Sequence, residues 1–142
     1  MTTNMILSDI ESERRTATVG NDVAPGTALI IGGRPVVTIT GSGDYDGNAI
    51  TMTANGVTTT LFGGSGGVGL ADDEATVSPT GSYAFPVTGA SAATARGTAV
   101  YRTSGGVLTL TSSGNTLFGI VEFFRGELSA TDTVVTIGVN LG

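Results

Sequence analysis

The chain has 142 residues and a formal net charge of −6 at pH 7, contains no cysteine or histidine, and has arginine as all six of its basic residues. This composition excludes thiol chemistry, a Schiff-base lysine and a serine nucleophile with a histidine or lysine base, and it leaves carboxylate chemistry or metal ions held by oxygen ligands. The length favours one domain, and the negative charge argues against a nucleic-acid partner.

Residues 1–14 lack the Gly/Thr-rich composition of the rest of the chain, and their apolar residues stand among acidic ones. The apolar residues are Met5, Ile6, Leu7 and Ile10. Because so short a segment cannot bury its own apolar side chains, we predict an extended N-terminal arm that becomes ordered against a partner. A frayed terminus or an edge strand is the alternative. The segment has neither the basic start nor the apolar run of a signal peptide, and no stretch of the chain approaches the roughly 20 apolar residues of a membrane span.

From residue 15 onward, short β-favouring segments alternate with turns rich in Gly, Asn and Asp. The predicted strands are 15–19, 27–31, 35–40, 50–54, 57–61, 82–85, 98–102, 107–111, 116–124 and 133–139. We therefore predict an all-β fold, a compact small β-barrel or sandwich over residues 15–142, with Gly-rich loops near 41–48 and 63–74. At most two short helical turns are expected, at Ser8–Glu11, which has capping-box spacing, and at Ala90–Arg96.

The strongest local signal is Asn55-Gly56, a dipeptide that adopts positive φ readily and closes a type I′ hairpin. This turn predicts that Ala54 faces Val57, and it sets the register of both strands. One side of the hairpin, expected to face inward, then carries Ile50, Met52, Ala54, Val57 and Leu61. The opposite side carries Thr51, Thr53, Thr58 and Thr60, which tolerate water.

An internal similarity relates two parts of the chain. Residues 26–30 (GTALI) resemble residues 97–101 (GTAVY). A Gly-Gly turn follows each segment, and after it come residues 36–39 (VVTI) or 107–110 (VLTL). We expect two similar hairpins, from duplication or from the common composition of Gly/Thr-rich β proteins.

Three motifs suggest ligands at first sight. Residues 64–69 match G-x-G-x-x-G, but they run into three acids and Pro79 rather than into the helix that a dinucleotide site requires, so we predict a surface loop. Residues 44–48 (DYDGN) resemble the start of a calcium loop without its later glutamate, and the run Asp72-Asp73-Glu74 is acidic. We interpret both acidic segments as ordinary turns, with a loosely bound cation as the alternative, and we expect no cofactor.

A carboxylate-only glycosidase needs two acids in a cleft lined with aromatic side chains. Phe118, Phe123 and Phe124 lie within one apolar strand, where core packing explains them better. Glu122 is the one acid of that strand. Strict alternation places Glu122 and Phe124 together on the outer face of the strand. Because Phe124 is a large apolar residue, we expect an interface to cover this outer face as well, so that both sides of the strand are buried.

The C-terminal half carries a series of short motifs. They are Gly97-Thr98-Ala99-Val100-Tyr101, Gly106-Val107-Leu108-Thr109, Gly114-Asn115, Phe118-Gly119-Ile120-Val121 and Val134-Val135-Thr136-Ile137-Gly138-Val139. Their order resembles that of small phage head proteins that decorate an expanded capsid, although Arg102 stands where tryptophan is common. Residues 11–19 followed by 24–29 are similar to the opening of lambda-type head decoration proteins. The central Gly-rich part, 41–75, has no counterpart.

This resemblance implies a non-enzymatic protein that binds the outer surface of a phage capsid and stabilises it. It further implies a homotrimer, with the arm contacting the major capsid protein through Met5, Ile6, Leu7, Ile10, Arg14 and Arg15. The protein would be made in the host cytoplasm and end in the virion, with no membrane and no nucleic acid as partner.

Other functions remain open at this stage. A tail-tube or fibre domain would form rings or fibres, and a carbohydrate-binding or glycosidase module would have a cleft joining two acids with Tyr45 or Tyr83. A filament subunit of a cell surface shares the Gly/Thr/Ala composition, but we see no export signal.

Overall fold

The computed structural model describes residues 5–7, 14–45, 50–61, 70–126 and 131–138. It confirms the all-β prediction, because no helix occurs among these residues. The chain forms two compact units. The first comprises Met1–Thr3, Arg15–Thr27 and Thr38–Val77, and the second comprises Asn4–Arg14, Ala28–Val37 and Ser78–Gly142. The predicted division into an arm, 1–14, and a single β domain, 15–142, stays a prediction.

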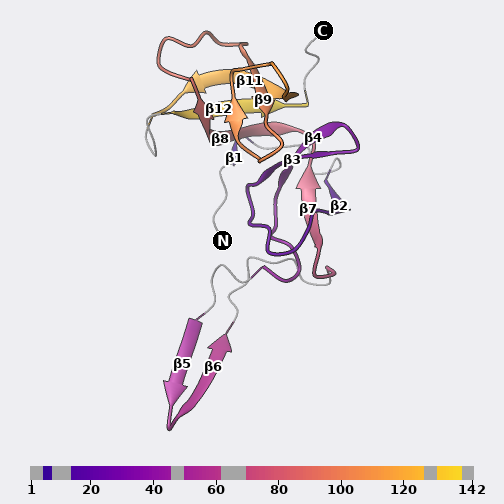
Figure 1. Cartoon of the computed structure of the whole chain (residues 1–142), viewed down its shortest axis with the longest axis vertical. Helices are drawn as coiled ribbons and strands as arrows, with labels where there is room; N and C mark the ends of the chain where they lie inside the picture. Colours follow the sequence, from indigo (N-terminus) through magenta and orange to yellow (C-terminus); the bar gives the residue numbers. More distant parts are fainter. Residues whose placement is uncertain (1–4, 8–13, 46–49, 62–69, 127–130, 139–142) are drawn as a thin grey trace. The chain divides into compact units, whose positions relative to one another are not determined.

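The second unit contains a closed five-stranded barrel (Figure 1). Its strands are β8 (Gly81–Thr88), β9 (Ala99–Arg102), β10 (Leu108–Thr109), β11 (Thr116–Phe124) and β12 (Asp132–Ile137). They pair in the order β8, β10, β9, β11 and β12, and β12 pairs again with β8. The β10–β8 pair is parallel and the other pairs are antiparallel. Closure leaves these strands without a long free edge.

Buried aromatic side chains of the barrel strands pack against one another. Tyr83 and Phe118 are almost fully buried, and the Phe85 ring lies 5.9 Å from the Phe118 ring in an edge-on contact. The Tyr83 hydroxyl donates a hydrogen bond to the carbonyl of Thr80, which satisfies the one polar atom of that ring. Four consecutive residues of β8, Ser82–Phe85, are buried, so this strand is covered on both faces.

Two irregularities in β11 change the side on which its residues lie. The pairing with β9 shifts between Leu117 and Gly119, and the pairing with β12 shifts between Val121 and Phe123. Each shift breaks the period of two, so Phe118 and Val121 are both buried although they are three positions apart. The prediction that strict alternation extends along this strand was therefore wrong. Phe123 is exposed, and Phe124 and Glu122 are half-buried.

A hairpin of β3 (Ala28–Ile31) and β4 (Arg34–Thr38) follows the predicted positions closely. Gly32 and Gly33 both have positive φ, as a tight two-residue turn requires. Within the second unit, Arg102 of β9 donates from Nε to the carbonyl of Ala28 at 2.8 Å, which attaches the hairpin to the barrel.

The internal similarity corresponds to two hairpins and to a shared local geometry at their starts. Thr27 Oγ1 donates to the carbonyl of Ala24 at 2.7 Å, and Thr98 Oγ1 donates to the carbonyl of Ala95 at 2.6 Å. The glycine before each threonine has positive φ. The β9–β10 pair is antiparallel, as the β3–β4 pair is. The segment 90–96 that was predicted to allow a helical turn forms only hydrogen-bonded turns, and 8–11 lies outside the described residues.

The first unit contains β2 (Arg15–Thr18) paired antiparallel with β7 (Glu74–Ser78). Strand β7 was not predicted, and its first residue belongs to the segment 63–74 that we expected to be a loop. Its side chains do alternate, with Ala75 and Val77 buried and Thr76 half-buried. The adjacent acids and Pro79 hid this short pattern, because both are typical of turns.

The first unit also contains the hairpin of β5 (Ile50–Ala54) and β6 (Val57–Leu61). Its register is the predicted one, with Ala54 opposite Val57 and Ile50 opposite Leu61. Asn55 and Gly56 have φ values of 52° and 77°, which confirms the type I′ turn. The inward-facing side was wrong at the tip, because Ala54 and Val57 are both exposed. These strands form a separate two-stranded sheet.

Candidate interaction surface

The predicted arm contains a strand. Met5–Leu7 form β1, which pairs antiparallel with β8 at Met5 opposite Tyr83 and Leu7 opposite Ser82. This is the edge-strand alternative for these three residues. Ile10 lies outside the described residues, Arg14 is half-buried, and Arg15 is the exposed first residue of β2. The structure thus describes the backbone of five of the six predicted contact residues.

Strands β1 and β2 are each terminal in a sheet. Strand β1 has β8 as its partner and β2 has β7, and each is terminal in its strand order. Arg15, Thr16 and Thr18 of β2 are exposed, and only Ala17 is half-buried. The outer edge of a terminal strand presents backbone N–H and C=O groups to which an extended segment of another chain can add. The segment between β1 and β2 contains Ile10, so the predicted contact residue lies between two such edges in the sequence.

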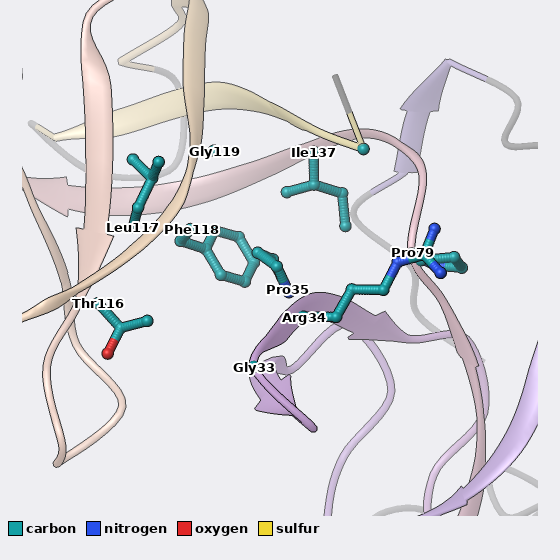
Figure 2. A pocket seen from close by; sticks show the side chains of 10 residues that line it. Gly33, Arg34, Pro35, Pro79, Thr116, Leu117, Phe118, Gly119 and Ile137 are labelled. Atoms are coloured by element: carbon teal, nitrogen blue, oxygen red, sulfur yellow. The ribbon is translucent and has the colours of Figure 1, made fainter. Parts of the chain in front are cut away.

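The second unit has a groove beside β11 (Figure 2). It encloses about 520 Å³, within the range of small-molecule and peptide pockets. Phe118, Leu117 and Ile137 supply apolar surface from the barrel, and Pro35 and Arg34 come from the turn end of β4. The remaining lining residues are Gly33, Pro79, Thr116, Gly119 and Gly138.

The chemistry of this groove is apolar with a single charged side chain, Arg34. None of its lining residues is an acid or a tyrosine. Acid–base cleavage of a glycosidic bond needs two carboxyl groups, so this groove lacks that machinery. Tyr83, one of the tyrosines expected in a sugar-binding cleft, is buried in the barrel instead. The groove was not predicted from the sequence. Pro35 and Leu117 lie far apart in the chain, and no pattern in their strands indicates that the two residues line one groove.

Asp44 connects two loops of the first unit. Its Oδ1 accepts hydrogen bonds from the backbone N–H of Asp22 at 2.8 Å and from Ser42 Oγ at 2.7 Å, and its Oδ2 accepts one from Asn21 Nδ2 at 2.9 Å. These bonds, led by the one from Asp22, lower the pKa of the Asp44 carboxyl below its ordinary value. Asp44 is therefore a structural acceptor that holds the loops together.

The acidic segments give no support to a metal site. Among the described residues, no group of three or more acids is arranged to hold a metal ion. Glu74 Oε1 accepts a hydrogen bond from the backbone N–H of Ala71, which closes a turn before β7. The Gly-rich motif 64–69 and residues 46–48 of the calcium-like segment lie outside the described residues.

Glu122 has a surface partner. Arg96 donates from Nε at 3.0 Å and from Nη2 at 2.9 Å to the same oxygen, Glu122 Oε2. The Arg96 side chain is 79% exposed, so this ion pair contributes little to stability. It fastens the 95–97 turn over β11, and it gives Glu122 a structural explanation that needs no substrate.

Comparisons with protein-family models, with curated proteins and with solved structures found no match. Among the residues that the structure describes, no helix has the length and hydropathy needed to cross a bilayer. The resemblance to phage head proteins stays an expectation carried by the motifs of the sequence.

Proposed function

We propose that this protein is a non-catalytic virion component that binds the outer surface of a phage capsid and stabilises it. The observation that carries the proposal is the terminal position of β1, because a short strand with one partner offers its outer edge to an extended segment of another chain. The order of sequence motifs supplies the kind of partner, the major capsid protein.

A protein that reinforces a shell has to make many moderate contacts and has no need of a reactive group. The composition fits that task, since the sequence contains no histidine, lysine or cysteine. The closed barrel provides a rigid body, and the exposed strand β2 offers a second edge beside Arg15. Contacts made together by several weak sites on one molecule give an avidity that exceeds each of them.

The proposed capsid contact is the segment 1–15, with Met5, Ile6, Leu7 and Ile10 as its apolar positions. Ile10 supplies an apolar group between acidic neighbours, and Arg14 and Arg15 supply planar cations that pair well with carboxylates. The proposal also includes self-association as a homotrimer, as the resemblance implies.

The test is co-sedimentation of the full chain with expanded, undecorated capsids of the phage that encodes it. We expect the protein to sediment with the shells and to raise their melting temperature. Ile10→Asp should weaken binding by more than tenfold, because it replaces an apolar contact by a charge that must be desolvated. Ser12→Asp is the matched control, since it adds the same charge to the same segment, and it should bind within about threefold of the original chain.

Circular dichroism and thermal melting of both variants separate a binding defect from a folding defect. If the original chain stays in the supernatant at every concentration tested, the capsid proposal is wrong. Rings or fibres in solution would instead favour a tail or fibre protein.

A further inference from the structure

Among the residues that the structure describes, the hairpin β5–β6 pairs with no third strand. Both strands belong to a two-stranded sheet in the described part of the chain. Residues 53–57 at its tip are all exposed, and Val57 is 65% exposed, the highest value among the large exposed apolar residues. An isolated two-stranded hairpin is marginally stable in water at best. A hairpin of this kind is stable when something packs against one of its sides.

The register shows which side is available for packing. Ala54 lies opposite Val57, and Ile50 lies opposite Leu61, so these positions share one side of the ladder with the Met52–Thr59 pair. The positions on the other side, 51, 53, 58 and 60, are all threonine. One side of the hairpin is therefore largely apolar and the other is water-compatible.

The distribution of charge identifies the partner. The sequence from Gly47 to Ala71 contains no Asp, Glu, Lys or Arg, although the whole chain carries a net charge of −6. Two copies of this chain repel each other wherever their acidic surfaces come together. The electrostatic free energy of association is least unfavourable when the contact is made through an uncharged segment. A partner of opposite charge would instead be expected to contact the acidic surface.

We propose that copies of this chain associate with one another through the apolar side of the β5–β6 hairpin. The hairpin of one copy packs against the hairpin of another, which buries Ala54 and Val57 and supplies the support that the single hairpin lacks. This assigns the interface of the self-association included in the proposed function, and it is tested apart from capsid binding.

The experiment measures the mass of the full chain by light scattering and by sedimentation equilibrium over a range of concentrations. We expect an oligomer for the original chain. Val57→Asp, which places a charge on the apolar side, should raise the dissociation constant by more than tenfold and produce monomers. Thr58→Asp adds the same charge to the opposite side at the next residue, and it should stay within about threefold of the original chain. Circular dichroism and melting curves check that both variants fold.

Salt gives a second readout. The associating copies carry like charge, so raising the ionic strength should leave the association unchanged or strengthen it. At 0.1–0.15 M salt the Debye length is roughly 8–10 Å, and repulsion between charges farther apart than this is largely screened. Association that weakens steeply with salt would contradict the proposal, as would a monomeric original chain or a Val57→Asp variant with unchanged mass. An oligomer that does not bind capsids would leave this inference standing and overturn the capsid proposal. A Val57→Asp variant that keeps its mass but loses capsid binding would show that the hairpin contacts the capsid instead.

Discussion

At the scale of single residues, Asn55 and Gly56 form the turn of the β5–β6 hairpin. The positive φ of Asn55 and Gly56 follows from the dipeptide itself, because few other residues adopt that conformation cheaply. The exposure of Val57 does not follow from it, since the burial of a side chain depends on what the rest of the chain places beside it. Glu122 shows the same limit, because its distance from Arg96 depends on a turn that lies 26 residues earlier.

Gly119 shows a residue whose small size is required by packing. A Cβ atom at this position would lie 2.5 Å from the carbonyl oxygen of Thr136 and 3.0 Å from side-chain atoms of Val135 and Ile137. We predict that Gly119→Ala lowers the free energy of unfolding by about 1–3 kcal/mol, because the barrel must shift to admit a methyl group. Urea denaturation followed by circular dichroism measures the change.

The matched control for that prediction is Gly105→Ala. A Cβ atom at Gly105 would meet nothing closer than Thr103 Oγ1 at 3.9 Å, so the substitution should change the free energy of unfolding by less than about 0.5 kcal/mol. Equal effects of the two substitutions would mean that the close approach at Gly119 is absent.

Asp44 predicts a dependence of stability on acid. Its folded-state pKa lies below the ordinary value of 3.8, so its ionised form contributes stability above pH 3.8 that is lost as the pH falls through the folded pKa. At pH 7, Asp44→Asn should lower the melting temperature, because the amide replaces one acceptor oxygen by a donor. The difference from the original chain should shrink at pH values where Asp44 is protonated in both states. Asp72→Asn, at an exposed acid, is the control, and it should leave the melting temperature at pH 7 unchanged.

At the scale of elements, the predicted strands agree best with the structure where a tight turn joins two neighbouring strands. The β3–β4 and β5–β6 hairpins have glycine-containing turns that fix register over a few residues. Strand β7 was missed because acidic residues and Pro79 surround a short alternating run. The irregular pairing of β11 was not predicted either. It depends on pairing with both β9 and β12, and the sequence of β11 alone does not indicate it. The groove beside β11 depends on the same long-range arrangement.

Hydrogen exchange should distinguish these elements. The amides of β8 and β12 should be the most protected, since β8 is buried over Ser82–Phe85 and β12 has a hydrogen-bonded strand on either side. The amides of β5 and β6 should exchange faster than those of the barrel at low protein concentration. If copies associate through this hairpin, its protection should rise with concentration while that of β8 stays unchanged. Protection of β5 and β6 equal to that of β8 in a monomer would contradict the marginal stability inferred for the hairpin.

At the scale of the whole molecule, composition predicts the class of fold and removes several chemistries, but it does not name a partner. Short segments rich in Gly and Thr indicate an all-β chain, and the structure confirms it with a barrel. The function of a binding protein depends on surfaces that only its contact with another molecule identifies. The outer edge of β1, which is terminal in its sheet among the described residues, is such a surface in the proposed function, and no pattern in Met5–Leu7 alone distinguishes an edge strand from an arm.

The closing strand of the barrel has a consequence for synthesis. Strand β12 lies between β8 and β11, and it is the last strand of the barrel to leave the ribosome. Until residue 137 has emerged, the wall beside Tyr83 and Phe118 is open, and an interrupted chain exposes apolar surface that promotes aggregation. We therefore expect that translation which stops before β12 gives fragments that aggregate. Closure of the barrel thus depends on the strand that is synthesised last among those that form it.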